Sequence, residues 1–139
     1  MTPVVIVIVL AGCTDGQDLT SNRADASNPD IVARGEVVYQ ESCASCHGVN
    51  LEGQANWTLR NADGTLPAPP HDVTGHTWHH GDELLFELTK WGPSAVVGND
   101  YNSAMPGFSD TLDDDDIWAV LAYIKSRWPD EVRAAQSAR

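Results

Sequence analysis

The sequence has few basic residues: 8 lysines and arginines stand against 20 aspartates and glutamates, a formal net charge of −12 at pH 7. A chain this acidic repels phosphate backbones, which excludes nucleic-acid binding. The charge also disfavours direct adhesion to anionic lipid headgroups. It favours partners with basic patches, at association rates that fall as salt rises, although acidity also serves solubility alone.

Cysteine is also scarce. The chain has three, Cys13, Cys43 and Cys46, and each has a separate candidate role, so none is left for a disulfide. Cys43 and Cys46 stand in C-x-x-C-H, the attachment signature of covalent c-type haem. Two thiols about one helical turn apart reach two vinyl groups on one porphyrin edge, and His47 supplies a nitrogen ligand for the iron. The motif predicts one haem c.

Two other interpretations of the C-x-x-C pair need further features. A thioredoxin-like redox pair sits near a βαβ pattern, and no segment of this chain alternates as a strand. A zinc site needs another cysteine or histidine cluster at matching spacing. The sequence offers neither feature, so haem attachment remains the prediction.

The chain lacks a long hydrophobic run, and the apolar segment near its start is short. Val4–Leu10 is apolar but far shorter than the about twenty residues that span a bilayer. The run continues into Ala11-Gly12-Cys13 and resembles a bacterial lipoprotein signal, although Met1-Thr2-Pro3 lacks the usual positive charge. The resemblance implies removal of residues 1–12, a lipid anchor on Cys13 and a place on the periplasmic side of a membrane. An ordinary cleaved signal is the alternative.

The length of 139 residues allows one domain, which we place at residues 29–130. Residues 13–28 are polar and are predicted to form a flexible tether, and residues 131–139 a C-terminal tail. Between residues 51 and 79, glycine and proline predict a long loop. Such a loop is expected where the chain wraps a large flat cofactor.

Three segments have helical patterns. The first starts at Asn28-Pro29-Asp30 and runs to about Glu41. The asparagine can cap the helix, the proline suits its first turn, and the aspartate is favourable at the positive end of the helix dipole. The second opens at His80-Gly81-Asp82 and stops at Gly92-Pro93. Its expected core-facing stripe is Leu84, Leu85, Leu88 and Trp91.

The third helix is predicted to start at the cap Asp113 and to end at Pro129. Residues 113–116 are four aspartates; a calcium site is disfavoured because consecutive helical residues point in different directions. The apolar face beyond them comprises Ile117, Val120, Leu121, Ile124 and Trp128.

Gly35, Tyr39 and Cys43 recur every four residues along one stripe of the first helix. The order of glycine, aromatic and haem cysteine resembles the N-terminal helix of class I cytochromes c, and the resemblance covers about residues 29–130. It implies an all-α cytochrome c fold of three to four helices around one haem. The N- and C-terminal helices would cross at Gly35, with either Tyr123 or Trp128 on the aromatic side.

Met105 lies in Ser103-Ala104-Met105-Pro106-Gly107-Phe108, which is similar to the family's loop that donates a methionine sulfur to the iron. A core-filling methionine is the alternative. Four histidines compete for the same position, and bis-histidine ligation would lower the reduction potential. They would otherwise be exposed, or form a separate metal or partner site: His71, His76, His79 and His80.

The second ring nitrogen of His47 needs a hydrogen-bond acceptor to fix its orientation. The family uses a proline carbonyl, which implies Pro69 or Pro70, unless these prolines only stiffen the loop. Indole side chains are predicted to line the haem crevice or bind a propionate: Trp57, Trp78 and Trp91.

The resemblance implies a carrier of single electrons between redox proteins by outer-sphere transfer, with both axial iron positions occupied and no catalytic group. One alternative is a haem enzyme with an open distal site that reacts with peroxide or binds a small gas. Another is a haem subunit of a larger membrane oxidoreductase.

Overall fold

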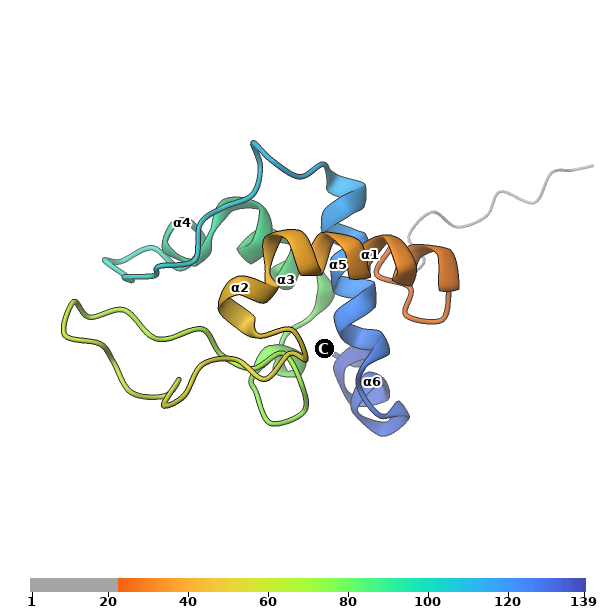
Figure 1. The fold of residues 1–139 in the computed structure, drawn as a ribbon, viewed down its shortest axis with the longest axis horizontal. Helices are drawn as coiled ribbons and strands as arrows, with labels where there is room; N and C mark the ends of the chain where they lie inside the picture. The colour runs from red at the N-terminus through yellow and green to blue at the C-terminus, as the bar shows by residue number, and fades with distance from the viewer. Residues whose placement is uncertain (1–22) are drawn as a thin grey trace, which may run out of the picture.

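The computed structural model describes residues 23–139 (Figure 1). The predicted signal, residues 1–12, and Cys13 lie outside the described residues. Within the described part the structure is all-helical, as predicted, and has no strand. More helices occur than the three to four expected because three short ones join the long ones. The order is α1 (Pro29–Ser42), α2 (Ala44–His47), the 3-10 turn η1 (Thr77–His79), α3 (Asp82–Trp91), α4 (Pro93–Val97), α5 (Asp114–Ser126) and α6 (Asp130–Ser137).

The two long helices begin at the predicted caps. The Asn28 side chain accepts hydrogen bonds from the backbone N–H groups of Asp30 and Ile31, at 3.0 and 3.3 Å. The Asp113 side chain accepts one from Asp116 at 2.7 Å. Each cap satisfies donors that a first helical turn cannot pair internally.

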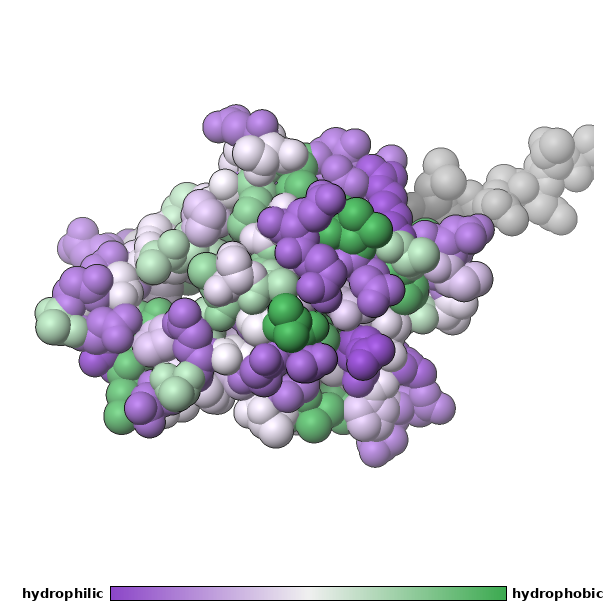
Figure 2. Space-filling model, in the orientation of Figure 1, coloured by the Kyte–Doolittle hydropathy of each residue, from purple (hydrophilic) through white to green (hydrophobic). Residues whose placement is uncertain are grey.

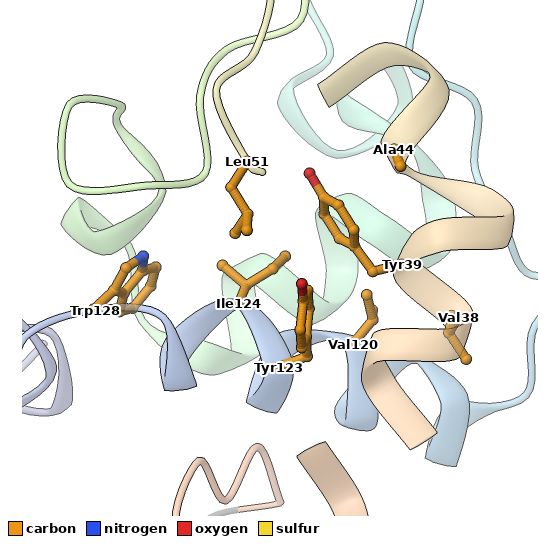
Figure 3. Packing of buried hydrophobic residues seen from close by; sticks show 8 residues of the cluster. All are labelled: Val38, Tyr39, Ala44, Leu51, Val120, Tyr123, Ile124 and Trp128. Atoms are coloured by element: carbon orange, nitrogen blue, oxygen red, sulfur yellow. The ribbon is translucent and has the colours of Figure 1, made fainter. Parts of the chain in front are cut away.

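Helix α1 crosses α5 at Gly35 (Figure 1). A Cβ at position 35 would lie 1.9 Å from the backbone oxygen of Ala119 and 2.9 Å from Cβ of Tyr123, so only glycine allows this approach. The Tyr39 and Tyr123 rings meet beside it, with centroids 5.3 Å apart (Figure 3). Of the two aromatic candidates, Tyr123 lies at the crossing.

Helix α5 is buried over residues 117–125, which include the whole predicted apolar face up to Ile124. It ends at Ser126, and Trp128, just past its end, is also buried. Pro129 precedes α6, so most of the expected tail, residues 131–139, is helical. Gln136 of α6 donates to the carbonyl of His80 at 3.0 Å, which fixes this helix to the domain.

The predicted stripe of α3 is wrong in part. Leu85 is buried and Leu88 half-buried, but Leu84 is 39% and Trp91 54% exposed. The helix packs on α5 through Leu85 and its neighbour Phe86, and Phe86 stacks on Trp118 with centroids 4.3 Å apart. Successive residues are about 100° apart on a helix, so Leu84 and Trp91 lie to one side of this contact. The buried Thr89 hydroxyl donates to the carbonyl of Leu85 at 2.8 Å.

The last residues of the predicted tether pack against the domain. Ala24 is fully buried in the cluster of α3 and α5 residues, and the Arg23 guanidinium lies 5.5 Å from the centre of the Trp118 ring. Residues 23–28 are therefore part of the folded unit.

Hydrophilic residues cover most of the face in Figure 2, and hydrophobic residues appear there in small separate groups. Among the described residues, no helix has the length and apolar character that crossing a bilayer requires.

Candidate haem-binding site

The C-x-x-C-H motif spans the junction of α1 and α2. Cys43 caps the C-terminus of α1, its N–H donating to the Tyr39 carbonyl at 2.9 Å, and the single turn of α2 carries Cys46 and His47. Both thiols are free in the described part of the chain, Cys46 exposed and Cys43 half-buried. Burial raises the pKa of the Cys43 thiol to about 11. The motif thus offers two uncommitted sulfurs beside one imidazole.

His47 is held in one orientation. Its side chain is 7% exposed, and its Nδ1 lies 2.9 Å from the carbonyl oxygen of Pro69, to which it donates. Burial lowers the pKa of His47, and the Pro69 contact opposes this in part, so the ring is neutral at pH 7, the form that binds iron. In the described residues this is the ring's one hydrogen bond, which leaves Nε2 available as a ligand.

The loop that carries Pro69, residues 48–76, folds back on the motif. We call it the proximal loop. The Gly53 N–H donates to the His47 carbonyl at 2.7 Å, and the Gln54 N–H to the Ala68 carbonyl at 2.9 Å. Gly53 has a φ of +67°, and a Cβ there would lie 2.4 Å from the Pro70 nitrogen. This close packing places the Pro69 carbonyl, rather than that of Pro70, against His47.

His71 lies beside His47, which its sequence position alone did not reveal. The two rings stack with centroids 3.9 Å apart and planes at 22°. Thr77 Oγ1 lies 2.6 Å from Nδ1 of His71, and the Trp128 indole donates to the His71 carbonyl at 2.7 Å. Burial, followed by the neighbouring His47, holds the pKa of His71 well below its ordinary value. Its position two residues after Pro69 indicates proximity to His47 but does not determine the stacking of the two rings.

The stacked geometry does not suit bis-histidine ligation by His47 and His71. The His71 ring lies face to face with the His47 ring, with centroids 3.9 Å apart, so the two imidazoles leave no room for a haem between them. The other three histidines gather elsewhere: His76 lies 4.9 Å from His79 and 4.8 Å from His80, between ring centroids. In the described part of the chain, no three His, Cys, Asp or Glu side chains are placed to hold a metal ion.

Met105 lies half-buried in residues 98–112, which we call the distal loop. The Met105 N–H donates to the Ser103 hydroxyl at 3.1 Å. Beyond Met105, the N–H groups of Phe108 and Ser109 donate to carbonyls of α3, at 3.1 and 3.0 Å. The loop is therefore fixed to α3, and axial ligation by Met105 stays a prediction.

The three tryptophans predicted near the haem differ in their surroundings. The Trp78 indole donates to the Val73 carbonyl at 3.3 Å, which occupies the N–H predicted for a propionate. Trp91 is mostly exposed, with the Lys90 ammonium 5.2 Å from its ring centre. Trp57 is half-buried in the proximal loop, and its role stays a prediction.

These residues fit a covalently attached haem. The thiols of Cys43 and Cys46 are unpaired, the His47 ring is neutral and oriented, and apolar core residues adjoin the motif (Figure 3). The cluster includes Tyr39, fully buried, whose hydroxyl donates to the Gly48 carbonyl at 2.8 Å. Tyr39 thereby links α1 to the residue that follows the motif.

Comparison with known proteins agrees with this geometry. Residues 32–128 match the cytochrome c family. The chain is 32% identical over 91 residues to the cbb3-type cytochrome c oxidase subunit CcoP of Azospirillum brasilense, covering 66% of this chain and 26% of that protein. It is 32% identical over 108 residues to the subunit of the same name from Azospirillum sp. (strain B510), covering 76% and 31%.

The chain thus spans less than a third of the length of these relatives. No solved structure matches it significantly. The family match covers more than half of the chain and includes the whole C-x-x-C-H motif and the described crossing of α1 and α5. The chain therefore belongs to the cytochrome c family, and its cofactor is haem c, held covalently through Cys43 and Cys46.

Proposed function

We propose that this protein carries single electrons, with His47 and Met105 as the two axial ligands of the haem iron. The observation that supports this most is the neutral, buried His47 ring, whose Nδ1 is bound to Pro69 while Nε2 remains available. When bound, haem supplies a one-electron couple at its iron.

The chain's own residues suit a carrier better than an enzyme. Pro69 fixes the His47 ring, and the contacts of the distal loop with α3 restrict the movement of Met105. With both axial positions occupied, no substrate needs to reach the metal. Electron exchange then needs only an approach of partner proteins.

Membrane oxidoreductases are the proposed setting. The two relatives are named as subunits of a cbb3-type cytochrome c oxidase, which favours a role for this domain beside or within a complex of that general kind. We propose export to the periplasmic side of a bacterial membrane and attachment through a lipid on Cys13. The net charge of −12 favours redox partners with basic docking patches.

Replacement of the proposed sulfur ligand tests the ligation. In the wild-type holoprotein, the ferric spectrum is expected to show the near-infrared charge-transfer band of a methionine–iron bond. Met105→Ala should abolish this band and lower the midpoint potential, because a thioether ligand raises the potential of haem iron. It should also let added imidazole bind faster than in the wild type, because no ligand has to be displaced. Spectroelectrochemical titration measures ligation and potential together.

Ser109→Ala is the matched control. Ser109 is exposed in the same loop, and its backbone contact with Lys90 survives the substitution, so this variant should keep the band and the potential. A Met105→Ala protein with the wild-type spectrum would contradict ligation by Met105. A high-spin wild-type spectrum would instead favour a haem enzyme with an open distal site.

A further inference from the structure

The tips of the proximal and distal loops meet at one side chain, Asn102. Its Nδ2 donates to the backbone carbonyl of Asp63 at 2.8 Å, although the two residues are 39 positions apart. Both tips lie at the left of Figure 1, the proximal one in yellow-green and the distal one in turquoise. We infer that Asn102 is a positioning residue: its bond to Asp63 is a latch that keeps the distal loop closed and thereby keeps Met105 on the iron. This rests on the proposed ligation by Met105.

The proximal end of the latch is a fixed point. The turn over residues 61–65 is closed by hydrogen bonds from the N–H of Asn61 to the Thr65 carbonyl at 2.8 Å and from that of Gly64 to the Asn61 carbonyl at 3.0 Å. The Asp63 carboxylate accepts from the Thr65 N–H and hydroxyl at 2.9 and 2.7 Å, and these bonds hold the pKa of Asp63 below its ordinary value. The Asp63 carbonyl is thus presented by a turn whose conformation is already set.

This turn is connected to the His47 side of the site. The two arms of the proximal loop are joined at Gln54, whose backbone N–H donates to the Ala68 carbonyl and whose side-chain oxygen accepts from the Ala68 N–H, at 2.9 Å each. The next residue, Pro69, accepts the bond from His47. The latch therefore joins the distal loop to the same segment that orients His47.

The distal end of the latch leads directly to Met105. Asn102 precedes Ser103, whose N–H donates to the Ser94 hydroxyl of α4 at 3.1 Å and whose own hydroxyl accepts from the Met105 N–H at 3.1 Å. A shift of Asn102 is thus passed to Met105 through one residue. Ser94 and Asp63 are the two anchors on this side of Met105.

The backbone before Asn102 adopts a conformation that is unfavourable for non-glycine residues. Asn99 and Asp100 have φ values of +51° and +62° and follow Gly98 at +66°. Non-glycine residues adopt this left-handed region at a cost, so these two persist there only where neighbouring contacts compensate. The latch is one such contact.

The two loops are otherwise separated by an open groove beside the latch. It has a volume of about 470 Å³ and is lined by residues of both tips: Arg60, Asp63, Gly64 and residues 97–102. Arg60 reaches across the proximal turn alone, its guanidinium donating to the Gly64 carbonyl at 2.7 Å. Among the described residues, the Asn102–Asp63 bond is the one hydrogen bond that joins the two tips.

The test measures how fast imidazole displaces the proposed ligand. In the ferric holoprotein, opening of the distal loop must precede imidazole binding, so the binding rate reports the open population. Asn102→Ala removes the donor and should raise this rate about two- to tenfold, the factor that corresponds to one net hydrogen bond. Asn102→Asp keeps the shape without the donor and should raise it at least as much.

Two further variants separate the latch from a general loss of stability. Ser109→Ala alters the same loop away from the latch, and Asp113→Ala weakens the start of α5; both should leave the imidazole rate unchanged within twofold. Asn102→Gln restores a side-chain amide donor and should bring the rate back toward that of the wild type.

Three outcomes decide the matter. A faster rate in Asn102→Ala and Asn102→Asp, with the near-infrared band present in the wild type, supports the latch. An unchanged rate in both variants overturns it, even if their thermal midpoints fall, because a merely structural contact would lower stability alone. A wild-type protein without the methionine–iron band overturns the proposed ligation first, and the latch with it.

Discussion

At the residue scale, the site is built from contacts within the C-x-x-C-H motif and from contacts that the proximal loop makes with it. C-x-x-C-H specifies two thiols and an imidazole by covalent spacing, and these need no tertiary information. Two other features depend on how the long proximal loop folds back. One is the use of the Pro69 carbonyl rather than that of Pro70, and the other is the stacking of His71 on His47 at 3.9 Å between centroids. The path of this loop cannot be predicted from the types of side chain in it.

Gly35 gives the clearest residue-scale prediction. A methyl group there would lie 1.9 Å from the Ala119 oxygen, so Gly35→Ala must push α1 and α5 apart. We expect the free energy of unfolding to fall by about 3 kcal/mol, the upper part of the range for an overpacked core, in spite of the better helix propensity of alanine. Chemical denaturation of the holoprotein, followed by circular dichroism, measures it.

Glu36→Ala is the control for that substitution. Glu36 is the exposed neighbour of Gly35 on α1, and its replacement should change the free energy of unfolding by less than about 0.5 kcal/mol. Equal stabilities of the Gly35 and Glu36 variants would mean that the helices do not cross as closely as described.

At the element scale, helix starts were predictable and helix faces less so. Asn28 and Asp113 cap α1 and α5 as expected, because a cap acts on its own first turn. The buried face of α3 was predicted only in part because it depends on the position of α5: Leu85 is buried in the cluster with α5, while Leu84 and Trp91 are exposed. The short helices α2 and α4 have too few residues for a periodic pattern to be detected.

The cap of α5 allows a prediction for the element as a whole. Asp113→Ala removes the acceptor that lies 2.7 Å from the Asp116 N–H and should lower the free energy of unfolding by about 1 kcal/mol. Asp113 also lies 3.0 Å from Arg34, but exposed ion pairs of this kind contribute little. Urea titration in low and high salt separates the two contributions, because salt weakens the electrostatic part, including the ion pair, whereas the cap hydrogen bond remains.

Asp115→Ala tests the same assignment from the other side. This side chain is 84% exposed and lies 3.9 Å from Arg34, so its loss should change stability by no more than a few tenths of a kcal/mol. If Asp113→Ala and Asp115→Ala lower the free energy of unfolding by the same amount, the four aspartates stabilise α5 through their charge rather than through a cap.

At the scale of the whole molecule, the long-range contacts were beyond sequence reasoning. The buried Lys125 of α5 pairs with Asp82 at 2.7 Å, at the start of α3. The Trp128 indole binds the His71 carbonyl, and the Asn102 amide binds that of Asp63. Each contact joins segments that only the complete fold brings together. The resemblance to a known family predicted the outline of the fold, and these contacts fix its loops.

The fold also limits how far the domain could lie from a membrane to which Cys13 was attached. Ala24 is buried and Arg23 lies over Trp118. If Cys13 carries the proposed lipid, residues 14–23 are therefore the most that could act as a tether, and ten residues reach about 33 Å when fully extended. That is shorter than the reach expected from a tether extending to residue 28. A short tether would favour partners held in the same membrane.

Replacement of the proposed lipid site tests this arrangement. Cys13→Ser should move the holoprotein from the membrane fraction to the soluble fraction, because a chain with a net charge of −12 is repelled by anionic headgroups and has no other proposed attachment. Washing wild-type membranes with concentrated salt is the control: a lipid chain resists salt, whereas ionic docking to a basic partner is screened. Wild-type protein released by salt, or Cys13→Ser protein that stays on the membrane, would contradict the anchor and would make protein contacts the cause of membrane association.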